Sequence, residues 1–307
     1  MYFLTEEERK LFLKKLLPKS REMSVAEELR GWNWHQPPLE PIYDVKLALY
    51  EIAGKYCTTG RDLYLKKVQG VKVKPNKAML MGSIFHEILL RILVNTKKLI
   101  YLKGVNGYRE ILEGLQQNKN VELESYKDDF NQEELSDIQR KVALISEFET
   151  SRIAARIQEA LSKHPYIGED ALVSLVVPVL AEQKLDGSFL GLSHHLSADA
   201  FMFSEPMIID LKFGDRKDFH RLATTGYAMV MEAMYEYPVN TGCLIYAEFR
   251  GNRLVISKDL HIIDDELRQW FIEERDEKMR MIYDEIDPGL AAECPETCPY
   301  YIICHGE

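Results

Sequence analysis

The stretch from Ser197 to Tyr227 constrains this chain most, because it predicts a buried strand that ends in charged residues. The apolar run Met207-Ile208-Ile209 is followed directly by Asp210, and Lys212 comes two residues later. Alternate side chains of a strand share a face, so Asp210 and Lys212 point the same way. Burying an aspartate and a lysine there costs free energy unless the two groups act together.

An upstream aspartate completes this candidate site. Asp199 lies in the strand predicted before it, and a turn at residues 204–206 would bring Asp199 across to Asp210. Two carboxylates and one ammonium in a small space can hold a divalent cation against a phosphodiester and place a water molecule beside it. The alternative is a surface hairpin with an ordinary ion pair, because a lone Asp-x-Lys tripeptide is common.

The composition is that of a soluble globular protein, with 46% hydrophobic and 29% charged residues in 307. The net charge of −10 argues against indiscriminate binding of nucleic acid. The charge is uneven, however, because residues 55–77 contain seven basic side chains against Asp62 alone. The seven are Lys55, Arg61, Lys66, Lys67, Lys72, Lys74 and Lys77. We expect a local basic surface here.

Neither a signal peptide nor a membrane span is predicted. The N-terminus has no charged-then-apolar pattern, and no apolar run approaches the roughly 20 residues that cross a bilayer. We therefore expect a cytoplasmic protein with no membrane partner.

Histidines are candidates for a third metal ligand. An apolar helix is predicted over residues 81–94, with Gly82 and His86 near its start. A lone histidine among apolar neighbours is usually a core residue, but the carboxylate pair lacks a third ligand. His195 shares a predicted strand face with Asp199 and ranks second.

The remaining pattern is that of a mixed α/β chain. A capping box at residues 131–134 predicts a long helix to about residue 163, with apolar residues at helical spacing. Strands are predicted over residues 172–182, 189–203, 241–249 and 253–262, followed by a charged helix to about residue 284.

The C-terminus holds a second constellation, in which Cys294, Cys298 and Cys304 lie within eleven residues. Cys57 offers a distant fourth thiolate, whereas Cys243 lies in an apolar strand and is interpreted as a small buried hydrophobe. An odd cysteine count in a cytoplasmic chain argues against disulfides. Zinc remains an alternative, but its usual paired C-x-x-C motifs are absent. One distant and three neighbouring thiolates favour a four-iron cluster (4Fe-4S) that pins the N-terminal third to the C-terminus.

These motifs together resemble a known family. G-x-x-x-H at residues 82–86, the isolated Asp199, D-x-K at residues 210–212 and the helical Tyr227 resemble the motif series of RecB-like nucleases. The one-plus-three cysteine frame is similar to the members with an iron–sulfur cluster. The length and the opening EELRGWNWHQPPLEP resemble the CRISPR-associated exonucleases of spacer acquisition, in their longer archaeal Csa-one variant. One departure is Ala223, where the family has a glutamine four residues before the tyrosine.

The resemblance implies an α/β fold with a restriction-endonuclease-like, PD-(D/E)XK nuclease core over residues 81–285. A helical N-terminal part, with the basic stretch and the first cluster cysteine, would occupy residues 1–80. A C-terminal cysteine cluster clasp would occupy residues 286–307.

The resemblance also implies roles for the candidate residues. The implied ligands of Mg²⁺ or Mn²⁺ are His86, Asp199, Asp210 and the backbone carbonyl of Leu211. Lys212 would orient the attacking water and offset charge on the phosphate, while Tyr227 helps to hold the DNA backbone. The implied cluster ligands are Cys57, Cys294, Cys298 and Cys304.

By resemblance, the chain is a metal-dependent exonuclease that trims single-stranded DNA for CRISPR spacer acquisition. The integrase and other adaptation proteins are the implied partners, and the basic stretch would guide the DNA. The alternative is a non-catalytic, cluster-bearing subunit that binds DNA or partner proteins in the adaptation complex. The acidic net charge and Ala223 favour this alternative slightly.

Overall fold

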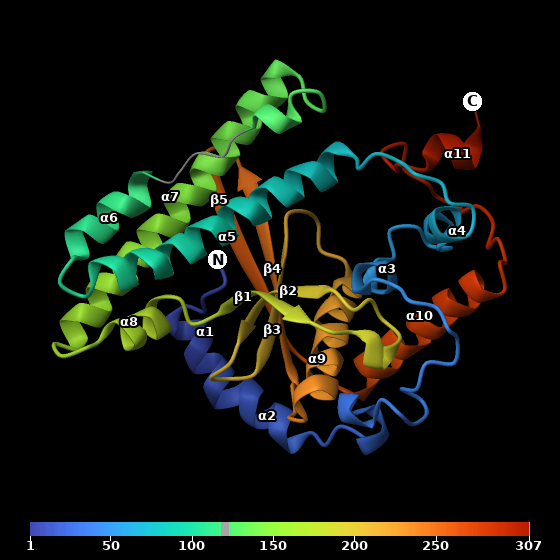
Figure 1. The fold of residues 1–307 in the computed structure, drawn as a ribbon, viewed down its shortest axis with the longest axis horizontal. Helices are drawn as coiled ribbons and strands as arrows, with labels where there is room; N and C mark the ends of the chain where they lie inside the picture. The colour runs from blue at the N-terminus through green and yellow to red at the C-terminus, as the bar shows by residue number, and fades with distance from the viewer. Residues whose placement is uncertain (118–122, 307) are drawn as a thin grey trace.

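The computed structural model describes residues 1–117 and 123–306 and folds them around a five-stranded mixed sheet (Figure 1). The strands follow the order β1 (Leu180–Leu185), β2 (Leu196–Met202), β3 (Met207–Lys212), β4 (Thr241–Arg250) and β5 (Arg253–Ile262). β3 and β4 are parallel and are connected through helix α9 (Arg221–Tyr235), whereas the other neighbours are antiparallel. The predicted α/β class is therefore confirmed, and the restriction-endonuclease-like fold stays a prediction.

Helices lie on both faces of this sheet (Figure 1). One layer consists of α5 (Lys77–Lys103), α6 (Tyr108–Gln117), α7 (Gln132–Lys163) and α8 (Glu169–Val176). The other consists of α9, α10 (Asp265–Tyr283), α3 (Leu49–Ala53) and α4 (Arg61–Lys67). The remaining α-helices are α1 (Glu6–Leu11), α2 (Leu17–Glu22) and α11 (Tyr301–His305). Each layer encloses its own hydrophobic core against the sheet.

The alternation of β3 distributes its side chains between these two cores. Met207, Ile209 and Leu211 belong to the core under α5 and α7, while Ile208 belongs to the core under α9 and α10. Burial of each such side chain contributes about 1.5–3 kcal/mol. By alternation, Asp210 follows Ile208 toward the α9 side, and it is itself buried at 5% exposure.

Two of the predicted strands need correction, although the long helix and the last two strands are confirmed. The strand expected over residues 172–182 is wrong, because residues 169–176 form α8 and β1 begins only at Leu180. The buried Leu172, Val173 and Val176 match one helical face as well as a strand interior. The strand expected over residues 189–203 is shorter, because Gly191 closes a helical turn with a left-handed φ of 73°.

Helix α5 is longer than the predicted residues 81–94, and its length bears on the membrane prediction. Among the described helices, it alone is long and apolar enough to span a bilayer, with a mean hydropathy of 1.4 and a third of that window buried. Ile84, Ile88 and Ile92 on its inner face belong to the core shared with α7 and the sheet. The absence of a membrane partner stays a prediction.

A buried carboxylate connects the N-terminal segment to α9 and α10. Glu232 on α9 is fully buried and accepts hydrogen bonds from Arg268 Nη1 at 2.7 Å and Arg30 Nη1 at 2.8 Å. The backbone N–H groups of Gly31 and Val239 donate to the same carboxylate, each at 3.0 Å. Two buried guanidinium groups therefore depend on one side chain for their counter-charge.

Replacing Glu232 with alanine should lower the free energy of unfolding by about 3–5 kcal/mol, because it leaves both guanidinium groups buried without a counter-charge. Urea unfolding would measure the loss. The matched control is Glu159→Ala, which removes an exposed helical ion pair with Lys163 and should change stability by less than about 0.5 kcal/mol. Equal losses of unfolding free energy in the two variants would contradict the role of Glu232 as the counter-charge of the two guanidinium groups.

Candidate active site

The two predicted aspartates lie where strand pairing ends. The ladder between β2 and β3 reaches the pair Ala200–Ile209 and stops before Asp199 and Asp210, which would be the next pair. Asp199 Oδ2 instead accepts a hydrogen bond from the backbone N–H of Leu211 at 2.9 Å. Asp199 and Asp210 are thus not paired with each other in the β2–β3 ladder, and their carboxylates can contact other groups.

Lys212 lies against Asp210, as the shared strand face predicts. Its Nζ is 2.9 Å from Oδ2 and 3.2 Å from Oδ1 of Asp210. Burial lowers the pKa of Lys212, but the carboxylates of Asp210 and Asp199 outweigh it and raise the pKa above its usual value. The ammonium is therefore charged. Asp210 Oδ2 is buried and accepts no hydrogen bond of good geometry, despite the nearby ammonium.

His86 reaches Asp199 from α5, with Nδ1 3.6 Å from Asp199 Oδ2. Burial raises the pKa of Asp199 from 3.8 to about 6; His86 lowers it and Asp210 raises it further. His195 is exposed on the segment before β2. Of the two candidate histidines, the structure thus brings His86 to the carboxylates.

The fit of these residues to a divalent cation rests on their chemistry. In the described ranges, no three histidine, cysteine, aspartate or glutamate side chains come together closely enough to hold a metal ion. The candidate ligands form two pairs instead, His86 with Asp199 and Lys212 with Asp210. The donors nevertheless suit Mg²⁺ or Mn²⁺, because these cations prefer carboxylate oxygens and accept imidazole, and a buried Asp210 oxygen accepts no hydrogen bond of good geometry. The ligand set, including the Leu211 carbonyl, stays a prediction.

Tyr227 reaches this site from α9. Its hydroxyl donates to the carbonyl of Ser197 at 2.7 Å, and burial together with Asp210 and Asp199 raises its pKa. Ala223 lies one turn earlier and is buried in the core beneath α9. A side chain without hydrogen-bonding groups thus occupies the position of the family's glutamine.

A hydrogen-bonded aromatic group beside Lys212 is not predicted by the sequence. Tyr56 Oη is 3.0 Å from His220 Nε2, and His220 Nδ1 is 3.1 Å from Tyr246 Oη. Tyr246 is the partner of Lys212 in the β3–β4 ladder. Burial, with a smaller effect of Lys212, lowers the pKa of His220 to about 4, so its imidazole is neutral. No local pattern joins residues so far apart in sequence.

The four predicted cluster cysteines are each partly buried. Burial, followed by the thiols of Cys298, Cys304 and Cys57, raises the pKa of Cys294. Cys243 is 1% exposed in β4, and burial raises its pKa to about 12. Burial thus separates Cys243 from the four partly buried cysteines, whose assembly into a metal centre stays a prediction.

Hydrogen bonds join the two segments that carry these cysteines. Thr59 Oγ1 donates to the carbonyl of Gly289 at 3.0 Å, and Arg61 forms two bonds of 2.9 Å with the Asp287 carboxylate. The C-terminal segment therefore lies against the N-terminal third, as the predicted clasp requires. A metal cluster between them stays a prediction.

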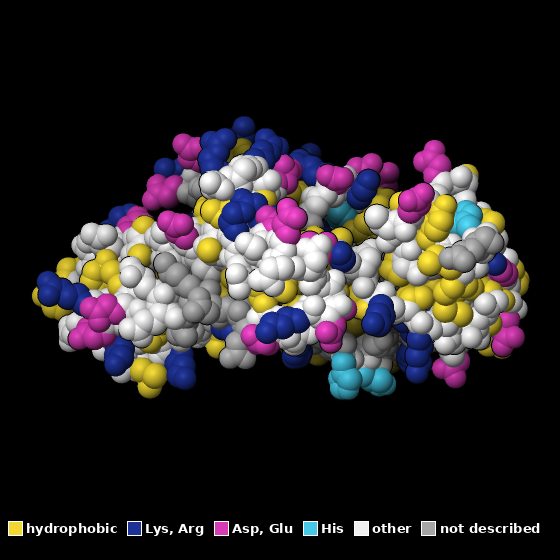
Figure 2. Space-filling view, turned by 90° about the horizontal axis from the view of Figure 1, so that it is seen from above, with side chains coloured by type: hydrophobic (Ala, Val, Ile, Leu, Met, Phe, Trp, Pro, Cys, Tyr) yellow, Lys and Arg dark blue, Asp and Glu magenta, His cyan; other side chains and the backbone are white. Residues whose placement is uncertain are grey.

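The predicted basic stretch is largely neutralised. Five of its seven side chains form ion pairs: Lys55 with Glu274, Arg61 with Asp287, Lys66 and Lys67 with Glu51, and Lys77 with Glu134. Figure 2 shows basic and acidic side chains interspersed over one face of the molecule. The stretch thus offers less free positive charge than its sequence predicts.

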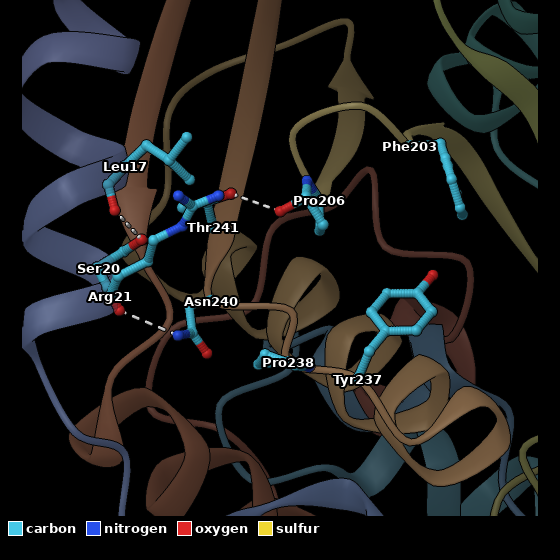
Figure 3. Close-up of a pocket in the computed structure, with 9 residues that line it drawn as sticks. All are labelled: Leu17, Ser20, Arg21, Phe203, Pro206, Tyr237, Pro238, Asn240 and Thr241. Carbon is cyan, nitrogen blue, oxygen red and sulfur yellow. Dashed lines mark hydrogen bonds between the residues drawn. The ribbon is translucent and has the colours of Figure 1, made fainter.

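A cavity of about 340 Å³ lies near the start of β3, at the end away from Asp210 and Lys212 (Figure 3). It is lined by Leu17, Ser20, Arg21, Phe203, Pro206, Tyr237, Pro238, Asn240 and Thr241. These residues include no carboxylate, imidazole or thiol. The cavity therefore does not compete as a candidate active site with Asp199 and Asp210, which lie where the β2–β3 ladder ends.

Comparison with known proteins gives a consistent result. The family model for CRISPR-associated exonuclease Csa1 matches residues 1–307. The chain is 34% identical over 308 residues to a CRISPR-associated exonuclease Csa1 of Saccharolobus solfataricus, with 99% of each chain covered. It is 29% identical over 280 residues to a CRISPR-associated exonuclease Csa1 of Thermoproteus tenax, with 91% of each chain covered.

Asp199→Asn should stabilise the metal-free protein above pH 6. The folded state raises the pKa of Asp199 from 3.8 to about 6 and so binds this proton more tightly than the unfolded state. The resulting penalty is absent below pH 4, grows as the pH rises to 6, and is complete above it. We expect a gain of about 3 kcal/mol at pH 8 and roughly half of that at pH 5. Thermal unfolding with a chelator measures both, and a loss at pH 8 would contradict the burial argument.

Proposed function

Because this chain belongs to the CRISPR-associated exonuclease Csa1 family, we propose that it is a RecB-like, divalent-metal-dependent DNA exonuclease. It hydrolyses phosphodiester bonds in single-stranded DNA and trims precursors for CRISPR spacer acquisition. It works in the cytoplasm with the integrase and other adaptation proteins. The nuclease domain has the restriction-endonuclease-like fold that the motif series implies.

The observation that carries this proposal is that two pairs of predicted residues, His86 with Asp199 and Lys212 with Asp210, lie where the β2–β3 ladder ends. Asp199 lies between His86 and the backbone of Leu211, and Asp210 contacts Lys212. These groups come from separate elements, α5, β2 and β3, so their meeting is a property of the fold. A surface hairpin with one exposed ion pair would leave Asp210 exposed, whereas it is 5% exposed.

In the mechanism, His86, Asp199, Asp210 and the carbonyl of Leu211 would hold Mg²⁺ or Mn²⁺. When bound, the cation would supply Lewis-acid polarisation of the scissile phosphate and would lower the pKa of a water molecule. Lys212 carries a full positive charge beside the carboxylates, so it orients the attacking water and stabilises charge that develops on the phosphate. Tyr227, whose raised pKa keeps it protonated, donates its hydroxyl to the Ser197 carbonyl and would support the DNA backbone from this position.

Replacing Lys212 with alanine should lower the cleavage rate of 5′- or 3′-labelled single-stranded DNA in Mn²⁺ by about 10²–10³-fold. The substitution removes the cation that would stabilise the transition state. The matched control is Lys163→Ala, which removes an exposed lysine on α7 and should leave the rate unchanged. Equal rates for the parent and the Lys212 variant would reject the proposed mechanism.

We further propose that Cys57, Cys294, Cys298 and Cys304 bind a 4Fe-4S cluster. The fit rests on four partly buried thiols whose segments are already joined by hydrogen bonds near Gly289 and Asp287. Such a cluster would supply a covalent connection between the N-terminal third and the C-terminal segment. Its thiolates need no paired C-x-x-C motif, unlike the usual ligands of structural zinc.

Protein purified without oxygen should be brown and contain iron and acid-labile sulfide. Cys294→Ser should lose iron and melt at a lower temperature, because binding of a structural metal centre contributes to folding free energy. Cys243→Ala is the control and should retain its iron, since this thiol is buried in β4. Colourless protein with stoichiometric zinc would assign the four thiolates to zinc instead.

A non-catalytic, cluster-bearing subunit of the adaptation complex is the second candidate. The pairing of five basic side chains with carboxylates and the apolar Ala223 favour it, because both weaken the grip on a DNA backbone. The same Lys212→Ala assay separates the two functions, since a binding subunit would show no Mn²⁺-dependent cleavage to lose.

A further inference from the structure

Glutamates occupy all of the left-handed, non-glycine backbone positions in the described residues, and one of them is not at a helix end. Glu236, at φ 54°, ends α9, and Glu285, at φ 53°, follows α10. Left-handed residues are common at such helix ends. Glu182, at φ 51°, lies inside β1. A side chain with a Cβ adopts this conformation within a strand only at a cost in free energy.

Glu182 lies directly across from Asp199. The register of β1 and β2 passes from Ala181–Ala200 to Gln183–Ala198 and omits the Glu182–Asp199 pair between them. The β2–β3 ladder also ends just before Asp199. Asp199 is therefore released from strand pairing on both sides, which leaves its carboxylate to contact His86 and the Leu211 N–H.

The Glu182 side chain reaches the same segment. Ser197 Oγ donates to Glu182 Oε2 at 2.6 Å and accepts a hydrogen bond from Lys184 Nζ at 3.1 Å. The carbonyl of Ser197 accepts the hydroxyl of Tyr227 at 2.7 Å. Ser197 thus connects Glu182 to Tyr227, and it lies two residues before Asp199 on the same strand.

We propose that Glu182 is a positioning residue of the nuclease site. Its left-handed backbone interrupts the β1–β2 ladder beside Asp199, and its carboxylate fixes Ser197 and, through Ser197, Tyr227. Glu182 then acts on the reaction by setting the place of the Asp199 carboxylate, not by touching the phosphate. The inference deepens the proposed function and rests on it.

Glycine substitutions at the three left-handed glutamates test this proposal in the full-length protein. Glu182→Gly, Glu236→Gly and Glu285→Gly should each raise the melting temperature, because glycine adopts positive φ without strain. Only Glu182→Gly should lower kcat, by about tenfold or more with KM for DNA little changed, since misplaced catalytic groups cost rate. It should also weaken Mn²⁺ binding, measured by calorimetry without DNA. Glu182→Gln keeps an acceptor for Ser197 and should lose less activity.

Each outcome decides the proposal. A Glu182→Gly variant with the kcat and Mn²⁺ affinity of Glu236→Gly overturns it, as does a lower melting temperature for Glu182→Gly alone. A parent protein that binds Mn²⁺ but cleaves no DNA would reject the proposed function. In that case, weaker Mn²⁺ binding by Glu182→Gly still supports positioning of Asp199. A parent that neither binds Mn²⁺ nor cleaves DNA overturns both.

Discussion

The carboxylate of Glu232 is the interaction on which the arrangement of one whole layer depends. Burying an ion costs several kcal/mol unless its hydrogen bonds are complete, and here Arg30, Arg268 and two backbone N–H groups complete them. Because these partners come from the N-terminal segment, α10 and the chain after α9, one carboxylate fixes three parts of the molecule. The helix that carries it also carries Tyr227, so this network sets where that tyrosine meets β2.

Helix α10 extends the same principle along its buried side. Arg275 donates to the main-chain carbonyls of Leu39, Pro38 and Leu190, and Lys278 donates to three carbonyls at the end of α3. Cations near the C-terminal carbonyls of a helix are stabilising, and these carbonyls would otherwise lack partners. The N-terminal segment is therefore held against α10 up to Tyr56 and Cys57. It contacts the candidate active site through Tyr56 and the cysteine segment through the residues that follow.

The candidate active site lowers the stability of the sheet that carries it. Asp199 and Asp210 place two carboxylates in a partly desolvated space, and the raised pKa of Asp199 is one measure of that cost. The left-handed backbone of Glu182 adds strain where the β1–β2 ladder is interrupted. Lys212 and His86 offset part of the negative charge. A bound cation would offset more of this negative charge and would therefore stabilise the folded protein.

The sequence by itself determined the elements that follow from local periodicity and the residues that break it. The Met207–Lys212 strand, the long helix after Asn131 and the separation of Cys243 from the other cysteines were all predictable, because each rests on neighbours in sequence. The strand pattern also selected Asp199, Asp210 and Lys212, whereas Tyr227 entered the candidate active site through the family resemblance. The sequence misassigned α8, because a short apolar run fits a helix or a strand equally well.

Only the tertiary structure decided what those residues contact. It chose His86 over His195, paired most of the basic stretch with carboxylates, and brought Tyr56, His220 and Tyr246 beside Lys212. It also placed Glu182 opposite Asp199, in a left-handed backbone conformation that the sequence does not predict. The physical reason is that such contacts depend on strand register and on packing between segments 100 or more residues apart, as with Tyr56 and His220, 164 residues apart. A local sequence pattern cannot predict contacts between residues so far apart in the chain.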